Sequence, residues 1–239
     1  METYIILPAR LESSRLPKKL IQRIGDSVLI EHMILTAKKI KNSKVIVSTD
    51  SKIIQSYADK HNVESIYSTR SFKNGTERCY FTAKKINASK NDIIINLQAD
   101  EFNINPNDVT KLIRLLKLSS DIKICTLVYE TFDKKHYLNS DYVKVIVDKQ
   151  LKAVTFTRKP ITSLCSKYLI HLGVYAFKFE SLESYSKLKE CHYEQEESLE
   201  QLRLIWNNVP IYCVQVKNNK SIGINSARDL KCARELYDN

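Results

Sequence analysis

The fold is decided by residues 4–20, which read Tyr4-Ile5-Ile6-Leu7-Pro8-Ala9-Arg10-Leu11-Glu12-Ser13-Ser14-Arg15-Leu16-Pro17-Lys18-Lys19-Leu20. The apolar run at the start predicts a buried first strand, because a short apolar run bounded by a turn signal is typical of core strands. The chain leaves this strand at Pro8 and then carries Arg10, Arg15, Lys18 and Lys19. A cationic loop after a first α/β strand is where an anionic ligand, often a nucleotide phosphate, is expected. The loop has no glycine-rich cradle, so side chains would have to bind the phosphate.

Beyond this loop, apolar runs and amphipathic stretches alternate along the chain. The alternation predicts βαβ units, and hence a single α/β domain with a Rossmann-like, mixed but mostly parallel sheet flanked by helices. The second half is richer in strands and is expected to add a small antiparallel flap, a candidate dimer arm. Ser27, Thr76 and Ser226 are the expected helix N-caps. The predicted strands are 4–6, 44–48, 63–68, 92–97, 122–129, 143–147, 153–156, 168–177, 209–216 and 222–224, and the predicted helices are 27–40, 51–61, 76–86, 106–116, 180–188, 194–207 and 226–237.

The composition predicts a globular protein with anionic partners. Of the 239 residues, 43% are hydrophobic and 27% are charged, and the formal net charge is +11. A basic balance favours nucleotides, phosphates, acidic sugars or nucleic acid as ligands. Because the basic residues are spread along the chain and not gathered in a tail, a solvated lysine-rich surface is a better interpretation than nucleic-acid binding.

The six cysteines do not form a metal-binding pattern. No pair has CxxC spacing, and Cys125 and Cys213 lie inside apolar runs, where they are expected to be core residues. Free thiols predict a reducing compartment. The chain begins directly with a strand, and no apolar run has the length of a membrane span. We therefore expect a cytoplasmic protein that does not insert into a membrane.

Three polar clusters follow predicted strands. The opening loop supplies cations, residues 98–101 (Gln98-Ala99-Asp100-Glu101) supply carboxylates, and residues 74–78 supply a polar turn. Cations and a carboxylate at neighbouring strand ends suit a nucleotide–Mg²⁺ site, in which one or two carboxylates and the substrate phosphates hold the metal. Phosphoryl or nucleotidyl transfer at such a site needs positioning and charge stabilisation, and no protein nucleophile.

Several of these residues also have a purely structural interpretation. Asp100 suits a turn after a strand, and Thr76 suits a helix N-cap. His171 lies between apolar residues in a predicted strand, where a histidine is more often a core residue than a catalytic one. Glu197 and Glu200 suit the solvated face of a helix. The cationic loop is harder to explain structurally, because small and polar residues separate its two arginines.

An ordered set of motifs carries a family resemblance over nearly the whole chain. The motifs are Pro8-Ala9-Arg10, Ser13-Ser14-Arg15-Leu16-Pro17 with Lys19, Ser48-Thr49-Asp50, Gly75-Thr76-Glu77-Arg78, Asn96-Leu97-Gln98-Ala99-Asp100-Glu101, Val143-Lys144-Val145, Phe156-Thr157-Arg158, His171-Leu172-Gly173-Val174-Tyr175, Leu199-Glu200-Gln201-Leu202-Arg203 and Gly223-Ile224-Asn225. In this order they resemble the sugar-acid cytidylyltransferases, and within them the 3-deoxy-manno-octulosonate (Kdo) cytidylyltransferase family. The resemblance implies a nucleotide-diphospho-sugar transferase-like fold in which residues 1–120 mainly bind nucleotide and residues 121–239 add sugar-binding and dimerisation elements.

The resemblance also implies a reaction and a set of residue roles. CTP would transfer CMP to the anomeric hydroxyl of Kdo or a related acidic sugar, releasing pyrophosphate, with Mg²⁺ as cofactor and a homodimer as the assembly. The catalytic residues would be Arg10, Arg15, Lys19 and Asp100, with Lys19 stabilising transition-state charge. The nucleotide would be bound by Ala9, Arg10, Ser13, Ser14, Arg15, Lys19, Thr49, Asp50, Thr76, Arg78 and Gln98. The sugar acid would be bound by Gln98, Arg158, His171, Tyr175, Glu197, Glu200 and Gln201, and the metal by Asp100 and Asn225.

The chain departs from the family's pattern at several positions. The family has Gly where this chain has Lys18 and Ala99, and its segment between Arg158 and His171 is longer. It has Asp where this chain has Asn225, and an amide offers Mg²⁺ a carbonyl oxygen without the charge. The short segment leaves open a cytidylyltransferase for another acidic or amino sugar. Asn225 leaves open a non-catalytic nucleotide-binding protein.

Overall fold

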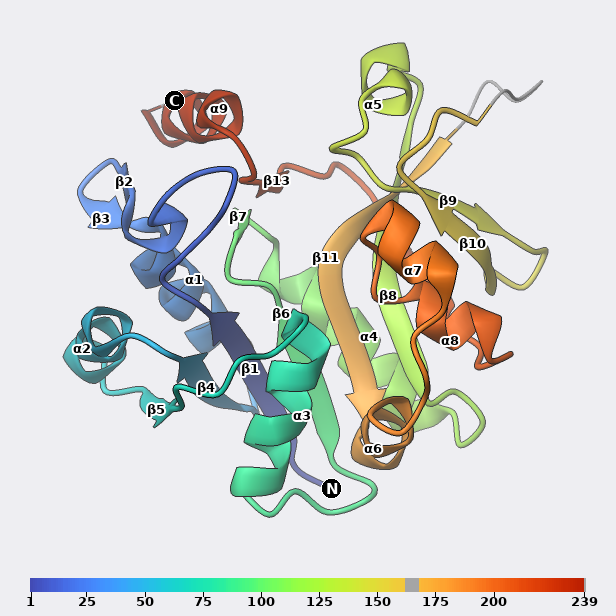
Figure 1. Cartoon of the computed structure of the whole chain (residues 1–239), viewed down its shortest axis with the longest axis horizontal. Helices are drawn as coiled ribbons and strands as arrows, with labels where there is room; N and C mark the ends of the chain where they lie inside the picture. The colour runs from blue at the N-terminus through green and yellow to red at the C-terminus, as the bar shows by residue number, and fades with distance from the viewer. Residues whose placement is uncertain (162–167, 239) are drawn as a thin grey trace.

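The structure is a computed structural model that describes residues 1–161 and 168–238 (Figure 1). Its strands are β1 (Thr3–Ala9), β2 (Arg23–Ile24), β3 (Ser27–Val28), β4 (Lys44–Thr49), β5 (Glu64–Tyr67), β6 (Ile93–Leu97), β7 (Glu101–Phe102), β8 (Ile124–Thr131), β9 (Lys144–Val147), β10 (Ala153–Thr157), β11 (Tyr168–Lys178), β12 (Tyr212–Val216) and β13 (Ile222–Gly223). Its helices are α1 (Leu29–Lys38), α2 (Lys52–Lys60), α3 (Gly75–Lys85), α4 (Pro106–Leu118), α5 (Lys134–Leu138), α6 (Phe179–Tyr185), α7 (His192–Glu197), α8 (Leu202–Trp206) and α9 (Ala227–Asp238), with a 3₁₀ turn, η1, at Lys19–Ile21. Half of the short segment between Arg158 and His171, residues 162–167, lies outside the described residues.

Nine of the described strands form one mixed sheet. Its long path runs β10-β9-β11-β6-β1-β4-β5, and β8 and β12 extend it on the other side of β11. The strands β6, β1, β4 and β5 pair in parallel, as expected for βαβ units. The long strand β11 then runs antiparallel to β6, β8 and β9. The predicted single α/β domain is confirmed, and β9 with β10 forms an antiparallel hairpin where the flap was expected.

Helices cover both faces of this sheet (Figure 1). Side chains alternate between the two faces along a strand. Thus Ile5 and Leu7 of β1 pack into one apolar cluster with α1, α2, α4 and α9, whereas Ile6 packs into a second cluster with α3, α6 and α8. The opening strand is a continuous apolar run because both of its faces are buried.

Two of the predicted helix caps are wrong. Ser27 lies in β3, because Gly25, with φ +57°, turns the chain into the short β2–β3 hairpin before α1 begins. The side chain of Asn74, and not that of Thr76, caps α3 by accepting a hydrogen bond from the N–H of Glu77 at 2.9 Å. Asn is as good an N-cap as Thr, so position in the turn decided between them.

The helix predicted over residues 194–207 is also wrong in one respect. It is two short helices, α7 and α8, separated by Ser198 in the left-handed region at φ 52°. The N–H of Leu199 bonds to the carbonyl of Glu194 at 3.1 Å, as in a helix C-cap that usually places Gly at the left-handed position. The sequence does not predict a helix end at residue 198, because serine is not typical of this position. The strands β2, β3 and β7 and the helix α5 are too short to show a period, and they were not predicted.

The cysteine and membrane predictions can be compared with the described residues. Cys125 and Cys213 are buried as expected. Cys79, Cys125, Cys191, Cys213 and Cys232 carry free thiols. No helix in residues 1–161 or 168–238 combines the length and the apolar character that a membrane crossing requires.

The carboxyl ends of the parallel strands bring the polar clusters together. β1, β4 and β6 end at Ala9, Thr49 and Leu97 along one edge, so the opening loop, Asp50 and Asp100 leave the sheet side by side. The C-terminal segment reaches the same edge because β13 pairs with β7. The N–H of Ile224 also bonds to the carbonyl of Asp100 at 2.9 Å. Topology therefore places Asn225 beside the opening loop.

Candidate functional site

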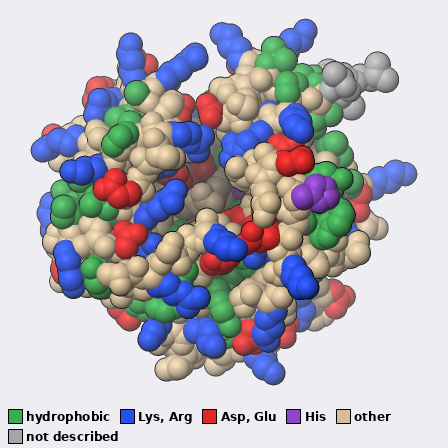
Figure 2. Space-filling model, viewed as in Figure 1, with side chains coloured by type: hydrophobic (Ala, Val, Ile, Leu, Met, Phe, Trp, Pro, Cys, Tyr) green, Lys and Arg blue, Asp and Glu red, His purple; other side chains and the backbone are tan. Residues whose placement is uncertain are grey.

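A cleft of about 910 Å³ opens at this edge of the sheet. Figure 2 shows it as a hollow in the middle of the face, with Lys and Arg side chains around its rim. An adjoining pocket of about 180 Å³ lies between the opening loop and the start of α3. Thirteen of the predicted site residues line the cleft: Arg10, Ser13, Ser14, Arg15, Lys19, Gln98, Asp100, Arg158, His171, Tyr175, Glu200, Gln201 and Asn225.

The remaining predicted residues support the walls. Arg78 lines the adjoining pocket, and its guanidinium donates from Nη2 to Asp50 Oδ2 at 3.0 Å. Asp50 Oδ1 accepts the N–H of Leu11 at 3.1 Å, so this carboxylate ties the opening loop to α3. Ala9 and Thr49 end their strands in buried positions beneath the loop.

Lys19 and Asp100 form a close ion pair across the cleft floor. The Lys19 ammonium contacts Asp100 Oδ2, and only 13% and 23% of the two side chains are exposed. The turn before Lys19 passes through Lys18 at φ 51°, a left-handed conformation that favours glycine. Ala99, by contrast, does not have a positive φ, so its methyl group is tolerated without backbone strain.

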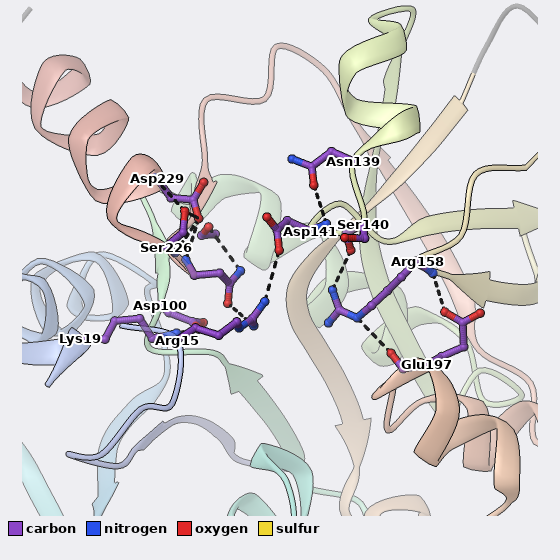
Figure 3. Close-up of polar contacts among 12 residues, drawn as sticks. Arg15, Lys19, Asp100, Asn139, Ser140, Asp141, Arg158, Glu197, Ser226 and Asp229 are labelled. Carbon is purple, nitrogen blue, oxygen red and sulfur yellow. Dashed lines mark hydrogen bonds and ion pairs between the residues drawn. The ribbon is translucent and has the colours of Figure 1, made fainter. Parts of the chain in front are cut away.

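Arg15 is held between two elements that are distant in sequence (Figure 3). Its Nη2 donates to Asn225 Oδ1 at 2.8 Å, and its Nη1 lies 3.3 Å from Asp141 Oδ1. Asn225 is fixed in turn by Asp229, whose Oδ2 accepts the backbone N–H of Asn225 at 2.9 Å. The Asp229 carboxylate also contacts Ser226. Ser226 is the predicted N-cap of α9, and its Oγ accepts the backbone N–H of Asp229.

Thr76 and Glu200 connect the two walls below the cleft surface. Thr76 Oγ1 donates to Glu200 Oε1 at 2.8 Å, and the Thr76 N–H donates to Oε2 at 3.3 Å. Asn96 donates to Thr76 Oγ1 at 3.1 Å. Burial raises the pKa of Glu200, while the two Thr76 hydrogen bonds work in the opposite direction. Glu200 is therefore a half-buried carboxyl group at the edge of the cleft and not part of a solvated helix face.

Arg158 supplies the cation on the opposite wall. Its Nη1 donates to the Ser140 carbonyl at 3.1 Å and its Nε to the Glu197 carbonyl at 3.0 Å. Burial, followed by repulsion from Arg15, lowers the pKa of Arg158. The Glu197 carboxylate accepts the Arg158 N–H at 2.9 Å and the Thr157 hydroxyl at 2.8 Å, so it fixes the end of β10 behind the cleft.

The hydrogen bonds of His171 define its tautomer. Its Nε2 lies 2.9 Å from Thr126 Oγ1, and that hydroxyl also lies 2.7 Å from the carbonyl of Val174. A carbonyl only accepts, so the single Thr126 proton goes to Val174 and His171 Nε2 carries the proton that it shares with Thr126. Burial, followed by the charge of Arg158, lowers the pKa of His171 to about 3. His171 is thus a neutral ring with Nδ1 free to accept a hydrogen bond.

Tyr175 adds an unused polar atom beside this ring. The rings of His171 and Tyr175 lie 4.9 Å apart, and Tyr175 is only 2% exposed. Its hydroxyl oxygen is buried and has no hydrogen-bond partner within the described residues. Buried hydroxyls are almost always bonded, so this oxygen is an exception among the described residues.

Three carboxyl groups that line the cleft were given no individual role from the sequence. Asp141 contacts Arg15, Asp229 holds Asn225, and Glu101 accepts the N–H of Gly173 at 2.8 Å. Burial is the main cause that raises the pKa of Glu101 to about 7, and Asp100 adds to it. Glu101 belongs to the carboxylate cluster predicted at residues 98–101, whereas Asp141 and Asp229 have no motif of their own.

The donor set fits a metal that is held mainly by substrate. No group of three or more His, Cys, Asp or Glu side chains in the described part of the chain could hold a metal ion. Asp100 keeps one carboxylate oxygen beyond its contact with Lys19, and Asn225 offers one amide oxygen. Mg²⁺ typically takes one or two protein oxygens and completes its shell with substrate phosphates and water, so these residues suit it.

Comparison with known proteins places this geometry in a family. The family model described as "Cytidylyltransferase" matches residues 4–217. The chain belongs to the cytidylyltransferase family. Proteins of this family are nucleotidyltransferases that generally use a divalent metal.

Full-length relatives carry one common name. The 3-deoxy-manno-octulosonate cytidylyltransferase of Elusimicrobium minutum is 32% identical over 100% of this chain and 99% of its own length. The protein of the same name from Polynucleobacter necessarius is 31% identical over 97% of this chain and 94% of its own length.

Solved structures agree with the relatives in fold. A CMP:2-keto-3-deoxy-manno-octonic acid synthetase complexed with CTP is 30% identical and superposes with a TM-score of 0.90 over 100% of this chain and 99% of that protein. A glucose-1-phosphate thymidylyltransferase from Bacillus anthracis, with 12% identity, a TM-score of 0.70 and coverage of 100% of this chain and 95% of that chain, shows the fold alone.

Proposed function

We propose that this chain transfers CMP from CTP to the anomeric hydroxyl of 3-deoxy-manno-octulosonate and releases pyrophosphate. One observation carries the proposal: a single cleft has Arg10, Arg15 and Lys19 on one wall and Arg158 on the other. Both substrates of this reaction are anionic, one through a triphosphate and one through a carboxylate. The family and the names of the full-length relatives support the same reaction.

The opening loop would bind the triphosphate. Arg10 is exposed at the cleft rim and is free to reach a phosphate, and Ser13 and Ser14 line the loop beside it. Arg15 would exchange its exposed contact with Asp141 for phosphate oxygens, since exposed ion pairs contribute little. Lys19 lies deepest of the three and would stabilise the charge that develops as the bond to pyrophosphate breaks.

The opposite wall would bind the sugar acid. Arg158 would pair with the substrate carboxylate, because a guanidinium matches a carboxylate in a two-bond geometry. Neutral His171 would accept a sugar hydroxyl at Nδ1, and Tyr175 would bond through its unpartnered hydroxyl. Glu200 and Gln201 line the same wall and would bind further hydroxyls. We accordingly propose that residues 121–239 supply most of the sugar site.

The reaction requires no covalent intermediate with the protein. The anomeric oxygen would attack the α-phosphorus of CTP, form the new phosphorus–oxygen bond and expel pyrophosphate, while its proton passes to solvent or to a nearby base. The protein would align both anions and neutralise their charge. Mg²⁺ bound by Asp100 and the Asn225 amide oxygen would supply further charge neutralisation on the phosphates.

We also propose a homodimer that acts in the cytoplasm. The β9–β10 hairpin exposes Ile146 and Val154, which are 40% and 53% exposed and suit an apolar interface. The free thiols among the described residues support a reducing compartment. Sedimentation of the intact protein tests the first statement, and a monomer at micromolar concentration would contradict it.

The decisive experiment measures pyrophosphate release from CTP and Mg²⁺ with a panel of sugar acids. Release with 3-deoxy-manno-octulosonate supports the proposal, and UTP in place of CTP tests the choice of base. Release only with another acidic or amino sugar would replace the substrate. Binding of CTP without any release would leave a nucleotide-binding protein.

A further inference from the structure

Lys144 is a buried lysine directly behind the sugar wall. It begins β9, is only 1% exposed, and pairs with Thr157 of β10 and Ile170 of β11. It therefore lies where three strands meet. The next residue, Val145, pairs with Leu169 of β11, which is the strand that carries His171. An ammonium group is rarely buried this deeply without a carboxylate partner.

The Lys144 ammonium bonds to backbone oxygens. Among the described residues its Nζ donates to the carbonyls of Asn139 at 3.1 Å, Tyr142 at 2.9 Å and Arg158 at 2.5 Å. These three bonds use all three of its donors. One ammonium thus ties residue 158 to both ends of residues 139–142, which we name the 139–142 turn.

The 139–142 turn holds one cation from each wall of the cleft. The carbonyl of Ser140 accepts Arg158 Nη1 at 3.1 Å, and the carboxylate of Asp141 lies 3.3 Å from Arg15 Nη1. Figure 3 shows Arg15 reaching Asp141 from one side and Arg158 reaching Ser140 from the other. The turn is closed internally, since Asn139 Oδ1 accepts the N–H of Asp141 at 2.8 Å.

We infer that Lys144 is a positioning residue for Arg158 and for the 139–142 turn, so that one buried ammonium sets where the sugar-acid cation stands. The identity of the substrates in this inference rests on the proposed function. Arg158 is fixed at its backbone by Lys144 and at its guanidinium by Ser140, and Lys144 also holds the residues on either side of Ser140.

Removing the ammonium would release this arrangement. The carbonyls of Tyr142 and Arg158 would lose the ammonium as their donor, and the carbonyl of Asn139 would keep only the N–H of Tyr142 at 3.3 Å. Carbonyl groups that lose their donor away from water are costly, so they do not stay in place. The 139–142 turn and the end of β10 would move apart to reach water. Arg158 would keep its charge but lose its position, which reduces binding of a carboxylate without removing the cation.

The first test is the variant Lys144→Met, which keeps the length of the side chain and removes the ammonium. Pyrophosphate release is measured with each substrate varied in turn. We expect the KM for 3-deoxy-manno-octulosonate to rise about 10- to 100-fold, because a small misplacement near the reacting groups is costly. The KM for CTP should change less than about threefold, since the Arg15–Asp141 pair is exposed and contributes little.

Lys178 provides a matched control. It is another buried lysine, 8% exposed, and its Nζ donates to the carbonyls of Ser119 and Ser120 at 3.3 and 3.5 Å. It ends β11, outside the residues that line the cleft. Lys178→Met should lower stability to urea without changing either KM. Equal KM values in the two folded variants would overturn the inference, because a purely structural lysine would behave in the same way.

Two further measurements separate this inference from the proposed function. Lys144→Met combined with Arg158→Met should raise the KM for the sugar acid no more than Arg158→Met alone, whereas additive effects would contradict a role through Arg158. Hydrogen exchange without substrates should be faster at residues 139–142 and 156–158 in Lys144→Met but not in Lys178→Met. Hydrogen exchange tests whether Lys144 positions these residues, even if the wild-type protein releases no pyrophosphate with this sugar.

Discussion

Replacing Arg203 by methionine should destabilise the protein strongly, because this buried cation serves several carboxylates. Arg203 is 3% exposed, and its Nε and Nη2 donate to both oxygens of Glu194 at 2.8 and 2.7 Å. Glu190 and Glu77 lie 3.5 and 3.6 Å away. The guanidinium also stacks 4.6 Å above the Tyr185 ring. Arg203 therefore connects α8 to α7 and, through Glu77, to α3 on the nucleotide side.

The magnitude follows from what the substitution leaves behind. Glu194 is only 8% exposed, and losing its partner would leave an uncompensated buried carboxylate. Breaking a buried pair in this way costs about 3–5 kcal/mol. For a domain of this size, that loss lowers the melting temperature by roughly 10 °C. Replacing the carboxylate as well, in Arg203→Met with Glu194→Gln, should recover most of the loss, because the most buried of the carboxylates around Arg203 is then neutral.

Urea unfolding followed by circular dichroism measures these differences directly. The control is Lys231→Met, which removes an ion pair with Glu235 whose side chains are 79% and 62% exposed, and which should cost less than about 0.5 kcal/mol. An Arg203→Met protein as stable as Lys231→Met would refute the reasoning. So would a double variant that is less stable than Arg203→Met.

Three further predictions concern the cleft. Lys19→Ala should lower turnover about 100-fold or more while the protein stays folded, because it removes a preorganised cation; near-normal pyrophosphate release would rule out this role. Asn225→Asp should lower the Mg²⁺ concentration for half-maximal activity by roughly threefold or more, since a carboxylate binds Mg²⁺ better than an amide. An equal shift in Asn219→Asp, which also lines the cleft, would show that any added negative charge has this effect and would contradict direct binding at residue 225. The pKa of His171 is lowered to about 3, so between roughly pH 6.5 and 3 the unfolded chain binds a proton that the folded chain does not. As the pH decreases through this range, this group lowers the free energy of unfolding by at most about 1.4 kcal/mol per pH unit. His171→Gln should therefore show a shallower acid decline in urea unfolding, and identical slopes would contradict a buried neutral ring.

The sheet could be predicted because its central strands are short apolar runs in the sequence. β1, β4 and β6 are apolar on both faces, and each is followed by a helix that covers one of them. The same topology places Arg10, Asp50 and Asp100 at one edge, so the nucleotide half of the cleft follows from the order of strands. The order of apolar and polar residues does not predict the direction of individual side chains. Thr76 points to Glu200 beneath the cleft and not into it.

The sugar wall could be predicted only in part, because its organisation depends on backbone groups. Arg158 and His171 were found through motifs, but the partners that hold them are carbonyl oxygens of Ser140 and a hydroxyl of Thr126. Every residue carries a carbonyl, so such partners leave no trace in the sequence. Lys144 is the clearest case, since a lysine in a β-branched run gives no sign that its ammonium is buried among three carbonyls.

The departures from the family's pattern do not weigh equally against catalysis. Lys18 adopts φ 51° and ψ 37°, a left-handed conformation that costs a non-glycine residue about 1–2 kcal/mol but leaves the loop in place. Ala99 has no positive φ and costs nothing. Asn225 alone of these three replaces an expected metal ligand, and its Oδ1 still accepts Arg15 at 2.8 Å. The non-catalytic alternative therefore depends on the metal and not on the phosphate loop, so titration with Mg²⁺ decides it more directly than any substitution among the arginines.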